Sequence, residues 1–68
     1  MKRFEINDKV KLNKLAYQEH PELADTTFAN KILIIVKHNN IEPISYDCSV
    51  QGTDIHTRSI LGIYLEFA

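Results

Sequence analysis

The sequence predicts an all-β protein, a small five-stranded antiparallel barrel, and two segments carry this prediction. Residues 31–37 place five apolar side chains, four of them β-branched, between two lysines. A run this short suits a strand covered on both faces better than it suits a helix. Residues 44–51 alternate between apolar and polar side chains, and the apolar set is Ile44, Tyr46, Cys48 and Val50. Because neighbouring side chains of a strand point to opposite faces, this set can close over the first segment.

Length and composition limit the architecture and indicate the compartment. The chain has 68 residues, 44% hydrophobic and 25% charged, so we expect one domain, residues 1–68, around one thin core. A single cysteine cannot form an internal disulfide, and no apolar run follows the basic N-terminus. These features favour a cytoplasmic, reducing environment. The longest apolar run is far below the roughly 20 residues of a membrane-spanning helix, so we expect no membrane partner.

Local signals place the first elements. Asn7 tolerates positive φ and Asp8 can hydrogen-bond nearby backbone, which predicts a tight bend before a strand over residues 9–12. Residues 13–30 are expected to form a long loop. Pro21 stops any long helix there, yet it fits the first position of a single helical turn. A short helical face before Pro21 is the alternative, and the predicted anchors of the loop are Leu15, Tyr17, Leu23 and Phe28.

Turns and strands alternate in the second half. Residues 38–40 are a turn signal, and Pro43 suits the first position of the next strand. A second turn contains Gly52, which can take positive φ, and it precedes a strand over residues 55–61. Residues 63–67 then close the chain as a short strand, alone or after a 3₁₀ turn. The predicted core is Ile6, Val10, Leu12, Ile32, Ile34, Val36, Ile44, Tyr46, Cys48, Val50, Ile60 and Leu65.

The two ends of the chain carry a resemblance. It opens with Phe4-Glu5-Ile6-Asn7-Asp8-Lys9-Val10-Lys11-Leu12 and closes with Tyr64-Leu65-Glu66-Phe67. With the long loop and three meandering strands between them, these segments resemble the small Src-homology-3-like barrels, including the KOW and Tudor-like forms of short bacterial and phage proteins. The chain departs from that pattern in having Asn7 where the family prefers glycine, and in lacking the KOW glycine. The resemblance implies a small barrel fold and a binding function, and it implies no enzymatic reaction.

Catalytic and metal-binding chemistry finds little support in the sequence. His20, His38, Cys48 and His56 lie 18, 10 and 8 positions apart, without the paired spacing of a metal site. Cys48 and His56 can face each other across the turn at Gly52, and such a Cys–His pair can form a thiolate nucleophile. Alternation places Cys48 in the core, however, where a thiol is an inert hydrophobe. We therefore expect no cofactor, no metal and no enzyme activity.

Two function classes remain. Residues 15–30 carry only acidic charges, and Glu19, Glu22 and Asp25 are the candidate contacts to a basic surface of an unknown protein partner. This favours an intracellular protein-interaction module or an inhibitor, and the short length with Ile- and Asn-rich usage fits a phage or mobile-element product. The alternative is weak nucleic-acid binding through a face made of Lys9, Lys11 and Lys37. A net charge of −1 and only two arginines argue against the alternative.

Overall fold

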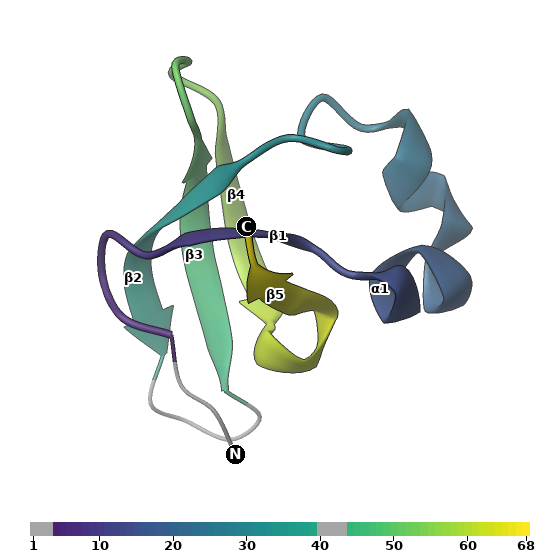
Figure 1. The fold of residues 1–68 in the computed structure, drawn as a ribbon, viewed down its shortest axis with the longest axis horizontal. Helices are drawn as coiled ribbons and strands as arrows, with labels where there is room; N and C mark the ends of the chain where they lie inside the picture. The colour runs from purple at the N-terminus through teal and green to yellow at the C-terminus, as the bar shows by residue number, and fades with distance from the viewer. Residues whose placement is uncertain (1–3, 40–43) are drawn as a thin grey trace.

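The computed structural model describes residues 4–39 and 44–68, and in them the chain forms one antiparallel sheet (Figure 1). The strands follow the order β4-β3-β2-β1-β5 across the sheet. They are β1 (Lys9–Leu12), β2 (Leu33–Asn39), β3 (Ser45–Val50), β4 (His56–Leu61) and β5 (Leu65–Phe67). The predicted five antiparallel strands are confirmed. Within the described residues β4 does not pair with β5, so the sheet is not closed into a barrel. The chain also contains helices, so the fold is mostly β rather than all-β.

The predicted bend before β1 is confirmed. Asn7 has a φ of 77°, a left-handed conformation that asparagine tolerates better than most residues. Asp8 accepts a hydrogen bond from the Glu5 amide through Oδ2 at 2.8 Å, and the Asn7 amide donates to the Ile35 carbonyl at 2.8 Å. The bend therefore fixes where β1 begins and where it meets β2.

The long segment after β1 contains more helix than the single turn that we expected. An α-helix, α1 (Lys14–Glu19), precedes a 3₁₀ helix, η1 (Pro21–Asp25). Asn13 caps α1 by accepting a hydrogen bond from the Ala16 amide at 3.0 Å, and Pro21 begins η1 as expected. Tyr17, Leu23 and Phe28 pack against the core as expected. Leu15 does not, because α1 turns Ala16 inward and leaves Leu15 exposed.

The inward face of β2 was predicted wrongly. Leu33 and Ile35 are fully buried, whereas Ile32 is 41% exposed, Val36 is 44% exposed and Ile34 is half-buried. The register explains the difference, since Leu33 lies opposite Val10 of β1 and Val50 of β3. A one-residue change of register moves a whole apolar set to the other face. The hydrophobic core covers only one face of β2, so the expectation that both faces are buried is also wrong.

Two irregular pairings bend the sheet around β3. The register of β2 on β3 shifts between Ile35 and Lys37, and that of β4 on β3 shifts between Tyr46 and Cys48. At the second shift Ser59 of β4 has a φ of 54°. Its amide donates to Asp47 Oδ1 at 2.9 Å, which stabilises the shift. Such bulges increase local bend and twist.

The core otherwise follows the alternation of β3. Tyr46, Cys48 and Val50 are buried as predicted, whereas Ile44 and Ile60 are half-buried. Ile6 was predicted wrongly: it is 45% exposed, because the bend at residue 7 turns it outward.

In the N-terminal segment Phe4, rather than Ile6, belongs to the core. Its ring packs edge-on against Tyr46 at 5.5 Å and against Phe67 at 4.9 Å, and its amide donates to the Tyr46 hydroxyl at 3.1 Å.

The turn predicted over residues 38–40 is wrong at His38 and Asn39, because both residues belong to β2 and pair with β3. The turns in the rest of the chain agree with the sequence. Gly52 has a φ of 81° in the turn between β3 and β4, and a 3₁₀ helix, η2 (Gly62–Tyr64), leads directly into β5. The predictions that Asn40 belongs to a turn and that Pro43 begins a strand concern residues outside the described ranges. None of the helices in the described part of the chain is long or apolar enough to span a membrane.

Candidate functional site

A groove of about 570 Å³ lies between the α1–η1 segment and strand β4. We call it the β4 groove. Its apolar lining includes Leu23 and Phe28 from the segment after α1, and Ile60 and Leu61 from β4. Its polar lining includes His20, Glu22, Arg58 and Tyr64. The groove thus combines an apolar lining with charged groups from several elements, which is the usual composition of a recognition site.

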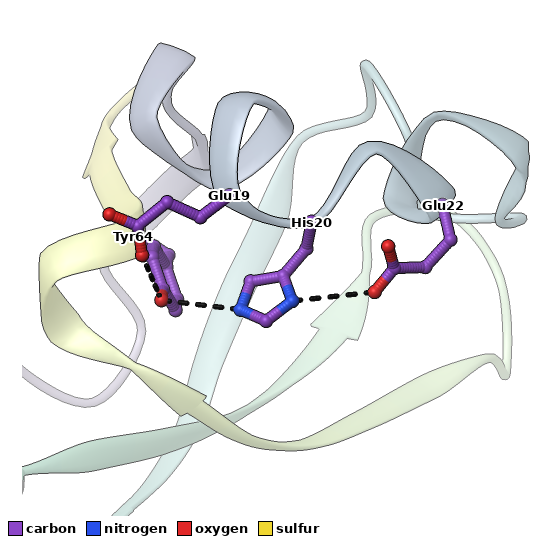
Figure 2. Close-up of polar contacts among 4 residues, drawn as sticks. All are labelled: Glu19, His20, Glu22 and Tyr64. Atoms are coloured by element: carbon purple, nitrogen blue, oxygen red, sulfur yellow. Dashed lines mark hydrogen bonds and ion pairs between the residues drawn. The ribbon is translucent and has the colours of Figure 1, made fainter.

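A chain of four polar side chains borders this groove (Figure 2). The Tyr64 hydroxyl donates to Glu19 Oε1 at 2.7 Å. His20 Nε2 lies 3.2 Å from the same hydroxyl, and its ring meets the Tyr64 ring edge-on at 5.2 Å. His20 Nδ1 lies 3.3 Å from Glu22 Oε2. The end of α1 and the start of η1 are therefore joined to η2, whose Tyr64 lies 44 positions from His20 in the sequence.

The directions of these hydrogen bonds follow from the available protons. The single hydroxyl proton of Tyr64 is given to Glu19, so the Tyr64 oxygen accepts from His20 Nε2–H. With a proton already on Nε2, Nδ1 donates to Glu22 only when the ring is an imidazolium. The contact between His20 and Glu22 is therefore an ion pair only when His20 is protonated.

Glu19 also acts on Tyr64 itself. The hydrogen bond to the Glu19 carboxylate, followed by desolvation and the charge of Glu19, raises the pKa of Tyr64 above its usual value. Tyr64 therefore remains a neutral donor at physiological pH, and it holds the Glu19 carboxylate in place beside the groove.

Two of the three predicted acidic residues belong to this arrangement. Glu19 and Glu22 are both part of the polar chain. Asp25 is exposed at the end of η1, and no contact joins it to the other two within the described residues. The sequence did not connect His20, Tyr64 or Arg58 with these carboxylates, and His20 was considered only as a possible metal ligand. His20 and Tyr64 are separated by 44 positions, so no local pattern could have indicated their contact.

The predicted lysine face is partly neutralised by carboxylates. Lys11 Nζ lies 3.5 Å from Glu66 Oε2, and Lys37 lies opposite Asp47 in the β2–β3 pairing. Lys9 lies opposite Ile34. All three lysines are exposed as expected, but two of them have an acidic neighbour.

Cys48 is buried, as expected for a packing residue, and is fully inaccessible to solvent. Desolvation is the main cause that raises its pKa to about 11, although the neighbouring Thr57 hydroxyl opposes the shift. Thr57, rather than His56, lies opposite Cys48 in the β3–β4 pairing, and His56 is exposed. The described residues contain no group of three or more His, Cys, Asp or Glu side chains that could hold a metal ion.

Comparisons with protein-family models, with characterised proteins and with solved structures gave no match.

Proposed function

We propose that this chain is a small cytoplasmic protein-interaction module, or an inhibitor of a partner protein, and not an enzyme. In this proposal the partner contacts the β4 groove. The single observation that carries it is the pairing of an apolar lining, with Leu23 and Phe28, and a carboxylate border made by Glu19 and Glu22. Interfaces combine an apolar centre with a polar rim in the same way.

The fold that we propose is an Src-homology-3-like barrel, of the kind encoded by phages and mobile elements. Three features support it. A 3₁₀ helix links β4 directly to β5, β5 pairs with β1 rather than with β4, and the bulges around β3 bend the sheet. Together they turn a flat five-stranded sheet toward closure.

The groove favours a basic partner segment. Glu19 and Glu22 place two carboxylates at its border. A lysine or arginine of the partner can pair with these carboxylates. Arg58 on the opposite wall disfavours a second basic group nearby. We therefore expect a segment with one basic side chain next to an apolar one.

Affinity capture from a nuclease-treated lysate of the native host tests this proposal. Glu19→Lys with Glu22→Lys should abolish retention of the partner, because both changes reverse charge at the groove. Glu5→Lys with Asp54→Lys is the matched control, since both residues are exposed and lie outside the lining of the groove. The control should retain the partner. Equal loss in both variants would reject the groove as the binding site.

The alternative of nucleic-acid binding through Lys9, Lys11 and Lys37 receives less support. Glu66 forms an ion pair with Lys11 and offsets a positive charge that a phosphate would need, and Asp47 lies opposite Lys37 in the β2–β3 pairing.

A further inference from the structure

A second groove, of about 520 Å³, is lined mainly by basic charged residues. Its basic lining residues are Lys11, Lys14 and Lys31, and Glu66 is its only acidic one. We call it the lysine groove. It shares only Leu12 with the β4 groove, so the two are separate surfaces. Because Lys11 pairs with Glu66, the ammonium groups of Lys14 and Lys31 remain in excess.

The fold gathers these lysines from three elements. Lys11 lies in β1, Lys14 is the first residue of α1, and Lys31 precedes β2. Antiparallel pairing of β1 with β2, with Val10 opposite Leu33, brings the start of β2 beside the end of β1. A cation at the start of a helix opposes the helix dipole, and the first turn of α1 contains no acidic residue to offset it. Helix stability therefore does not explain Lys14.

An aromatic ring lines the same groove in a fixed position. Tyr17 packs partly against the core, and its hydroxyl accepts a hydrogen bond from the Asn30 amide at 3.0 Å. Asn30 itself has a φ of 57°, so the chain turns sharply next to Lys31. The ring is thus held at both ends beside two unneutralised lysines.

We propose that the lysine groove binds single-stranded nucleic acid. Backbone phosphates lie against Lys14 and Lys31, and one base lies against the Tyr17 ring. Basic grooves with aromatic rings bind single strands in this way, and stacking tolerates any base. The groove lining contains no arginine, and therefore lacks the guanidinium that most often reads base edges. Binding is accordingly weak and independent of sequence, and it uses a different surface from the proposed protein partner.

Fluorescence anisotropy with a labelled oligothymidylate of about twelve nucleotides, which spans one such groove, tests the proposal. Two phosphate contacts predict a log–log salt slope of about −1.4 between roughly 50 and 200 mM salt. Lys14→Gln with Lys31→Gln removes both contacts and should therefore remove most of the salt dependence. Tyr17→Leu should weaken binding by about fivefold with the slope unchanged, provided that circular dichroism shows a folded chain.

Lys9→Gln with Lys37→Gln is the matched control, because it removes the same charge outside the lysine groove. This variant should bind like the wild type. Equal weakening in the two lysine pairs, or no binding by the wild type at roughly 50 mM salt, would overturn the proposal. It would also be overturned if polyglutamate bound through Lys14 and Lys31 while the oligonucleotide did not, since the groove would then recognise an acidic protein segment.

Discussion

At the scale of single residues, the fold depends on a few side chains that solvent does not reach. The largest of them are Tyr46, Leu33, Ile35, Val10 and Cys48. They come from three neighbouring strands, so each one packs against residues distant in sequence. In a domain this small, losing one such contact removes a large part of the total stability.

Ile35 and Val36 provide a direct test of the inward face of β2. Ile35→Ala should lower the free energy of unfolding by about 2–5 kcal/mol, because it leaves a cavity in the core. Val36→Ala should change it by about 0.5 kcal/mol, since Val36 is exposed and lies at the register shift. Urea unfolding of both variants measures the difference. Equal losses would contradict the assigned face.

We predict that the folded protein loses stability at alkaline pH because the Cys48 thiol is buried. Its folded pKa of about 11 lies above the usual value of 9.0 for a cysteine thiol, so the folded state holds its proton more tightly than the unfolded state does. The contribution of this thiol to the free energy of unfolding is complete below the unfolded pKa and is lost as pH rises through the folded pKa. The stability of the wild type relative to Cys48→Ala should therefore decrease between these two values. A constant difference across that pH range in urea unfolding would contradict the burial of the thiol.

At the scale of elements, Asn13 joins α1 to the end of the chain. Its Oδ1 caps the helix at the Ala16 amide, and its Nδ2 donates to the Ile63 carbonyl at 2.8 Å. The helix has only six residues, and isolated helices of that length are unstable in water. Its position beside the groove therefore depends on this residue and on the burial of Ala16.

Substitutions at Asn13 separate the two roles. Asn13→Ala should cost about 1–2 kcal/mol of unfolding free energy, because it removes both the cap and the link to Ile63. Asn13→Ser keeps a capping oxygen but loses the amide donor, so it should lie between the wild type and Asn13→Ala. Thermal unfolding provides the measurement. If serine proved as costly as alanine, the cap would contribute nothing.

The elements also show which parts of the fold the sequence could predict. The bend at Asn7, the turn at Gly52 and strand β1 depend on local signals, and they were confirmed. The inward face of β2 was not predictable in this way, because an unbroken apolar run contains no alternation. Its register is decided by pairing with Val10 and Cys48.

Helix α1 and the candidate site could be predicted only in part. The helix is stabilised by the contact from Asn13 to Ile63, fifty positions away. Charge alone indicated Glu19 and Glu22. Their arrangement depends on Tyr64, which only the folded chain brings beside α1.

At the scale of the whole molecule, two grooves with different charged residues flank the segment between β1 and β2. The β4 groove has Glu19 and Glu22 at its border, and the lysine groove has Lys14 and Lys31. Such a separation gives a chain with a net charge of −1 a distinct surface for each sign of partner, since local fields rather than the total charge steer association.

Nuclear magnetic resonance mapping tests the central proposal, binding of a protein partner in the β4 groove, most directly. Isotope-labelled chain would be titrated with the partner retained by affinity capture, and amide shifts would be followed residue by residue. We predict that the largest shifts fall on Leu23, Phe28, Ile60 and Tyr64, which line the groove, and that Lys9 and Lys37 do not shift. Shifts confined to Lys14 and Lys31, or to Lys9 and Lys37, would contradict the proposal.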